Sequence, residues 1–198
     1  MDVLTDDVDA LEGALLYPLI EQQGRDIVLY LHSYAGFPGS VAIAGYSKAE
    51  RLAAGKPGGI LGLIYQSAFI SNPGDTLLQM IGGNYAPWQN PNTQTGLVSV
   101  INPKDTFYAD VVEPLATTAT DLTYYGVAAY DNRRVYLHTN QDQALPPFAQ
   151  DAFVAGIGVK WNVIKLDTSH SLFYSEPQPL AALLIATTKG FLATYRKD

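Results

Sequence analysis

The chain has 198 residues, of which 47% are hydrophobic and 16% are charged, so it can bury one sizeable core as an ordinary globular domain. Its formal net charge of -7 leaves no basic surface for phosphates. We therefore expect neither nucleic acid nor a membrane as a partner, and a small, largely apolar molecule as the substrate. The absence of cysteine excludes disulfides and thiolate chemistry, and no histidine-carboxylate spacing suggests a metal.

The N-terminal stretch is acidic and lacks the basic and apolar regions of a signal peptide, and no apolar run reaches the roughly 18 residues of a membrane span. We therefore expect a cytoplasmic protein. Apolar residues at helical spacing predict a helix from Asp6 to Gln23. Pro18 should kink this helix or split it in two.

A continuous apolar run from Asp26 to Leu31 predicts a strand that is covered on both faces, and it ends directly on the segment HSYAG. The segment SKAERLAAG then predicts a short helix, because Ser47 and Glu50 form a capping box. A second buried strand is predicted from Gly59 to Ala68.

From Asn72 to about Asn132 the pattern loosens into an insert rich in proline, glycine, asparagine and aromatic residues. Short helical stretches are predicted within it, at Asp75 to Ile81 and at Phe107 to Ala116, and the insert is too long for a plain loop. The remaining predicted elements are a strand, a helix, a strand and a helix, at Arg134 to Thr139, Pro146 to Ala155, Lys160 to Leu166 and Leu180 to Tyr195.

Strands that alternate with helices predict an α/β fold, a three-layer, doubly wound and mostly parallel sheet in a single domain over residues 1–198, with the insert as a helical lid. In such a sheet reactive groups gather at the carboxyl ends of the strands. Three predicted strands are followed there by Ser33, Asp142 and His170. Their order along the chain, serine, acid and histidine, is the one that α/β-hydrolases use.

Four segments, spread so that together they span most of residues 26–175, are HSYAG, SKAERLAAGKPGG, NQDQALPP and DTSHSLF. In these segments the chain resembles the fungal and bacterial α/β-hydrolase superfamily whose nucleophile segment reads HSYGG. The resemblance implies a nucleophilic Ser33, an acidic Asp142 and a basic His170. We expect no cofactor. One departure is that the positions two places either side of the serine, usually small, are Leu31 and Ala35.

The second departure is that only about 25 residues precede the serine strand, so the fold is predicted to lack its N-terminal strands. The amide of Tyr34 can still face an oxyanion, but the loop that usually supplies the second amide would be absent. The strand at Asp26 to Leu31 would also become a sheet edge, and unpaired apolar edges invite association. We therefore expect a homodimer.

Several residues admit two interpretations. His32 adjoins the nucleophile and is expected to pack or hydrogen-bond near it, His138 to be structural, and Asp167 to build a local turn instead of serving as the acid. The aromatic residues of the insert either line an apolar pocket as a lid, which we favour, or form the core of an irregular subdomain. The residues predicted to line the pocket are Tyr85, Trp88, Phe107 and Tyr108.

The predicted function is a serine hydrolase that acts on an ester, lactone or thioester of a small, largely apolar molecule through an acyl-enzyme. One alternative keeps the fold and uses His170 for acid-base chemistry in a non-hydrolytic cyclase, lyase or isomerase of natural-product metabolism. Another is a degenerate, non-catalytic hydrolase homologue. Retention of all three triad residues argues against the last of these.

Overall fold

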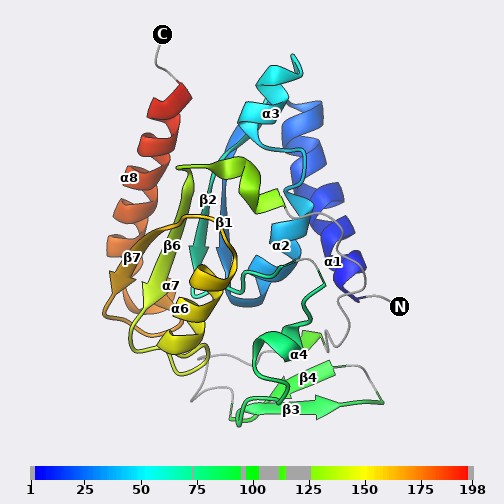
Figure 1. The fold of residues 1–198 in the computed structure, drawn as a ribbon, viewed down its shortest axis with the longest axis vertical. Helices are drawn as coiled ribbons and strands as arrows, with labels where there is room; N and C mark the ends of the chain where they lie inside the picture. Colours follow the sequence, from blue (N-terminus) through cyan, green and yellow to red (C-terminus); the bar gives the residue numbers. More distant parts are fainter. Residues whose placement is uncertain (1–2, 73, 95–96, 103–111, 115–125, 196–198) are drawn as a thin grey trace.

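A four-stranded parallel sheet forms the centre of the molecule (Figure 1). The computed structural model describes residues 3–72, 74–94, 97–102, 112–114 and 126–195. In the spatial order β1-β2-β6-β7, the strands are Asp26–His32, Gly59–Gln66, Arg134–Thr139 and Asn162–Leu166. The predicted α/β class is therefore confirmed, and each strand predicted from an apolar run forms close to its predicted bounds.

The two inner strands are covered on both faces, which explains their continuous apolar sequences. Every residue of β2 and of β6 is buried, as expected for the middle of a parallel sheet. Strand β1 lies at one end of the sheet, and β2 is its partner among the described strands. The predicted sheet edge is thus present, while the homodimer stays a prediction.

Helices on one face of the sheet enclose the larger core. They are α1 (Val3–Leu11) with its continuation η1 (Glu12–Gln22), α2 (Gly36–Ala42) and α6 (Pro147–Gly156). Side chains of η1, α2 and α6 pack in this core against inward-facing residues of the sheet. Its buried members include Leu16, Leu31, Ile43, Leu63, Tyr136 and Phe153. Val8 and Leu11 of α1 pack against it from outside.

The opposite face is covered mainly by α8 (Pro177–Tyr195), with the short α7 (Leu172–Ser175) before it (Figure 1). Phe191 and Leu180 of α8 pack against Leu61 and Leu137 of the sheet. Helix α3 (Lys48–Ala53) follows α2 and is capped by Ser47, whose hydroxyl accepts from the Glu50 amide at 3.2 Å. Helix, sheet and helix thus form the three predicted layers.

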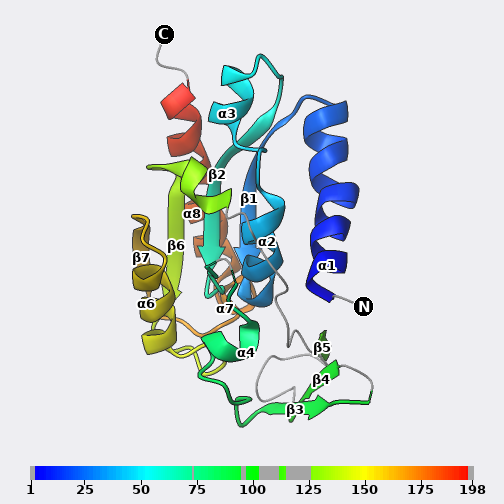
Figure 2. The ribbon, with the colours of Figure 1, turned by 45° about the vertical axis from the view of Figure 1, so that its right-hand side comes forward.

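The N-terminal helix does not break at Pro18, so the predicted split there is wrong. The helix widens from α1 into the π-helical η1 at Glu12 and continues through the proline to Gln22. A wider turn relieves the clash between the proline ring and the carbonyl of the preceding turn. The two parts form one rod beside α2 (Figure 2).

The insert is built differently from the helical lid that was expected. Its described residues form a short helix, α4 (Leu77–Met80), and a second, antiparallel sheet of β3 (Gln89–Asn92), β4 (Leu97–Val100) and β5 (Val112–Pro114), with a turn of 3-10 helix, η3 (Gly126–Tyr130), at its end. The helix predicted over Phe107 to Ala116 is wrong at Val112–Pro114, because these residues pair with β4; its other residues lie outside the described part.

The small sheet lies beyond the carboxyl ends of the main strands in both views (Figures 1 and 2). Elements of the insert therefore stand on the side of the molecule where a parallel sheet presents its reactive groups. None of the helices among the described residues combines the length and the apolar character that crossing a membrane requires.

Candidate active site

Ser33 lies in a strained turn between β1 and α2. Its φ of 54° is in the left-handed region, which a side chain adopts only at some cost. The 3-10 turn η2 (Ser33–Ala35) begins at this residue and runs directly into α2. The amide of Phe69 donates to the Ser33 carbonyl at 3.1 Å and so fixes the turn from the loop after β2. The sharp strand-to-helix turn places the serine side chain at the end of the sheet.

The missing small residues of the elbow are replaced by two glycines a little later in the chain. A Cβ on Gly39 would lie 2.6 Å from Cδ1 of Leu31, so the bare backbone of α2 makes room for this large side chain. Gly36 likewise lies close to the backbone after β2. The close contacts around the serine turn are therefore made at Gly36 and Gly39, although Leu31 and Ala35 occupy the two positions that are usually small.

The serine, histidine and aspartate predicted from three distant segments come together. The Ser33 hydroxyl lies 3.0 Å from Nε2 of His170, and Nδ1 of His170 lies 2.8 Å from Oδ2 of Asp142. A carboxylate can only accept, so Nδ1 carries the proton and Nε2 is left to accept from the serine. Asp142 and His170 are buried, whereas Ser33 is partly exposed at the pocket.

Asp142 remains an anion despite its burial. Burial by itself raises the pKa of this carboxyl, but the hydrogen bond and charge of His170, the Leu145 amide and the Thr139 hydroxyl together lower the pKa below its ordinary value. Its Oδ1 accepts from the amides of Ala144 and Leu145 at 2.9 and 2.8 Å. The carboxylate therefore both builds the local turn and faces the histidine.

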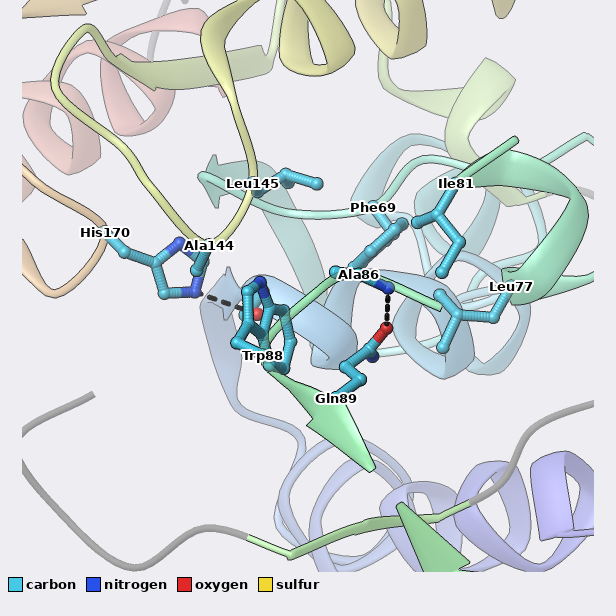
Figure 3. Close-up of a pocket in the computed structure, with 10 residues that line it drawn as sticks. Phe69, Leu77, Ile81, Ala86, Trp88, Gln89, Ala144, Leu145 and His170 are labelled. Carbon is cyan, nitrogen blue, oxygen red and sulfur yellow. Dashed lines mark hydrogen bonds between the residues drawn. The ribbon is translucent and has the colours of Figure 1, made fainter. Parts of the chain in front are cut away.

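A pocket opens directly over the serine and histidine (Figure 3). It encloses about 400 Å³ of empty space, open solvent included. Apart from Ser33, His170 and Gln89, its lining is apolar: Phe69, Leu77, Ile81, Ala86, Trp88, Ala144 and Leu145. The Gln89 side-chain oxygen accepts from the Ala86 amide at 2.9 Å, which orders this wall. The insert therefore contributes a largely apolar cover to the site.

The other predicted site residues have different positions. Trp88 lines the pocket together with Ala86 and Gln89, whereas Tyr85 is not among the lining residues. Phe107 and Tyr108 lie outside the described residues. The Tyr34 side chain turns towards α1, where its hydroxyl donates to Asp7 at 2.7 Å, so only the backbone of Tyr34 is beside the serine.

The rival acid and the remaining histidine stand apart from the triad. Asp167 accepts from the Gln141 side chain at 3.0 Å on the surface. His138 is buried in β6, with Nε2 positioned 3.2 Å from the Pro147 carbonyl. Among the described residues, no cluster of three or more histidine, aspartate or glutamate side chains could hold a metal ion.

Sequence reasoning missed the polar residues that support the triad. Thr139 and Gln150 both donate to Oδ2 of Asp142, at 2.9 and 3.3 Å. Gln66 donates to the main-chain carbonyl of His170 at 2.9 Å. Gln66 and Thr139 are the polar last residues of otherwise largely apolar strands, a signal that could have identified them, whereas Gln150 is in the middle of α6.

The chain belongs to the alpha/beta hydrolase family, whose model matches residues 2–183. A search of curated proteins found no match to this sequence. The family, the sheet and the order of the three segments agree with one another.

Three solved structures show the same fold at low identity. A pyrethroid hydrolase from Sphingobium faniae JZ-2 is 17% identical, with a TM-score of 0.69 over 90% of this chain and 76% of that one. A methylesterase from Arabidopsis is 18% identical, with a TM-score of 0.56 over 89% and 76% of the two chains. An extracellular alpha/beta-hydrolase from a Paenibacillus species is 16% identical, with a TM-score of 0.56 over 91% and 77% of the two chains.

The cytoplasmic location expected from the sequence stays a prediction.

Proposed function

We propose that this protein hydrolyses carboxylic esters of small, largely apolar molecules through Ser33, His170 and Asp142. The observation that carries the proposal is the unbroken pair of hydrogen bonds from the serine hydroxyl to the imidazole and from the imidazole to a buried carboxylate, at 3.0 and 2.8 Å. Two proteins of similar fold, a pyrethroid hydrolase and a methylesterase, support ester chemistry.

The mechanism begins with proton transfer from Ser33 to His170. Nε2 takes the hydroxyl proton as Oγ attacks the ester carbonyl, and the resulting imidazolium is stabilised by the carboxylate of Asp142. Nε2 then gives the proton to the leaving alcohol as the C–O bond breaks. A water molecule, deprotonated by the same nitrogen, attacks the acyl-enzyme and releases the acid. Such a positioned base contributes about 10²- to 10⁴-fold to the rate.

The tetrahedral intermediate requires donors aimed at its oxyanion. The amide of Tyr34, which directly follows the nucleophile in the elbow turn, is proposed as one donor, in line with the geometry of this elbow. The typical contribution of one such donor is about 3 kcal/mol.

The pocket supports an apolar substrate. Its walls of Leu77, Ile81, Trp88 and Leu145 present hydrocarbon and aromatic surface to the reacting centre, and His170 is the one lining side chain that can carry a charge. Esters with charged acyl groups would lose hydration there without gaining a partner. A neutral ester of a small acid is therefore proposed as the substrate class, with lactones and thioesters sharing the same reactive carbonyl.

The test is covalent labelling with a fluorophosphonate probe alongside turnover of p-nitrophenyl butyrate. We expect labelling of wild-type protein, loss of both signals in Ser33→Ala, and slow labelling in His170→Ala. An unlabelled wild-type protein without esterase activity would refute the proposal. If a non-ester reaction were then found that His170→Ala abolishes and Ser33→Ala spares, the acid-base alternative would replace it.

Among the described strands, β1 pairs with β2 on one side only, which also supports the proposed homodimer, because the other side of the strand offers its main-chain groups to a second copy. Light scattering at micromolar concentration is expected to give twice the chain mass. A monomer at that concentration would contradict the dimer and would leave the proposed ester chemistry untouched.

A further inference from the structure

The main-chain carbonyl of His170 is held by two side chains that come from neighbouring strands. Nε2 of His32, the last residue of β1, lies 3.1 Å from this oxygen, and Nε2 of Gln66, the last residue of β2, lies 2.9 Å from it. A carbonyl oxygen has two lone pairs, so the two donors together occupy its accepting capacity. The histidine loop is thus tied to the carboxyl ends of two strands.

The chemistry of the acceptor determines how both donors are oriented. Since the carbonyl can only accept, His32 must carry its proton on Nε2, and Gln66 must turn its amide nitrogen towards the loop. The Gln66 side-chain oxygen then accepts from the Tyr30 hydroxyl, which fixes the amide in this orientation. Gln66 is fully buried, so a lost partner would leave a costly unsatisfied group.

The loop needs such support because it has no regular secondary structure at His170, between β7 and α7. The imidazole must nevertheless stay within hydrogen-bond distance of both Ser33 and Asp142. A shift of about 1 Å in a catalytic group can cost about 100-fold in rate. The rings of His32 and His170 also lie 4.6 Å apart, and the Phe173 ring lies edge-on to His32 at 4.9 Å.

We propose that His32 and Gln66 are positioning residues that jointly hold the backbone of His170, so that its imidazole reaches Ser33 and Asp142 at once. We call this pair the carbonyl clamp. The clamp rests on the proposed function for its effect on rate, but not for its effect on the placement of the histidine. Both donors are neutral amide or imidazole groups, which hold the carbonyl without opposing the positive charge that His170 gains during turnover.

The two donor groups of the clamp can be removed by substitutions that keep side chains of similar size. His32→Phe keeps a ring against His170 and Phe173 but has no donor, and Gln66→Met keeps the length of the side chain. We expect each substitution to lower kcat and the fluorophosphonate labelling rate about 10-fold, with KM changed less than about twofold, because the substrate pocket is untouched. The double variant should lose less than the product of the two single losses, because both donors hold one oxygen, and a fully multiplicative loss would contradict the shared clamp.

Two further variants separate positioning from general damage. His32→Gln restores a neutral donor and should recover kcat to within about threefold of wild type. Ser175→Ala removes a bond to Thr168 in the same loop, 3.1 Å long, which does not involve His170, and should leave kcat unchanged. Circular dichroism and thermal unfolding establish that each variant is folded.

A readout independent of hydrolysis is the downfield proton resonance of His170 Nδ1–H, assigned by its loss in Asp142→Asn. We expect it to shift and broaden in His32→Phe and Gln66→Met and to keep its wild-type position in His32→Gln and Ser175→Ala. Folded clamp variants with a wild-type resonance would overturn the clamp. If wild-type protein shows this resonance but neither labelling nor turnover, the proposed function fails while the resonance still decides the clamp.

Discussion

Gly36 lies so close to the main chain of Phe69 that a Cβ on residue 36 would stand 2.3 Å from the Phe69 carbonyl oxygen. The same stretch of chain donates its Phe69 amide to the carbonyl of Ser33. The turn at Ser33 and the loop after β2 are therefore packed backbone against backbone, and this contact holds Ser33 in its left-handed conformation.

Gly36→Ala is expected to destabilise the protein by about 2–3 kcal/mol, since a backbone atom cannot move aside as a side chain could. Esterase activity per folded molecule should fall as well, because the elbow must shift. Urea unfolding gives the free energy. The matched control is Gly190→Ala in α8, where nothing lies within 4 Å, and it should gain about 0.5–1 kcal/mol. Equal stability of the two variants would contradict the packing argument.

Asp142→Asn is expected to lower kcat about 10³- to 10⁴-fold, because an amide can present a donor to Nδ1 and favour the wrong tautomer of His170. The asparagine oxygen can still accept from Ala144 and Leu145, so the fold should survive. Asp167→Asn, at the surface acid three residues before the histidine, should leave kcat within about twofold. Comparable losses in the two variants would show that the acid was assigned wrongly.

Trp88→Ala is expected to lower kcat/KM for p-nitrophenyl butyrate about 10- to 100-fold, as the loss of about 1.5–3 kcal/mol of apolar contact predicts. Tyr85→Ala provides the control, since this aromatic residue is close in sequence but does not line the pocket. Steady-state kinetics on both variants measure the difference. A larger loss in Tyr85→Ala would place the substrate elsewhere.

The stability of the protein should depend on His32 at mildly acidic pH. Burial, and next the charge of nearby His170, lower the pKa of His32 from 6.5 to about 4. Below about pH 6.5 His32 binds a proton in the unfolded chain but stays neutral in the folded chain. The free energy of unfolding therefore falls as the pH decreases towards 4. Protonation of His32 in the unfolded chain should lower the free energy of unfolding by about 2–3 kcal/mol between about pH 7 and about pH 4.5.

Urea unfolding of wild type and His32→Gln at both pH values isolates that contribution. The variant should lose less stability on acidification, because glutamine does not titrate and the other groups are common to the two proteins. Parallel pH profiles would mean that His32 titrates normally in the folded state.

The sequence by itself determined the parallel sheet, its strands and the three residues of the proposed triad. Short continuous apolar runs that alternate with helical segments indicate strands buried on both faces, and polar residues placed just after parallel strands meet at one rim. Ser33, Asp142 and His170 could therefore be named from local pattern and chain order. The resemblance in four short segments identified the α/β-hydrolase family, and the match of the family model to residues 2–183 confirmed it.

Only the tertiary structure decided how the insert folds and what supports the triad. Short polar strands such as Gln89–Asn92 carry no apolar periodicity, because their pairing is determined by neighbours distant in the chain. Gln66 and His32 converge on one carbonyl because β1 and β2 are paired in register at His32 and Gln66. That register is a long-range property of the folded chain, and no local pattern encodes it.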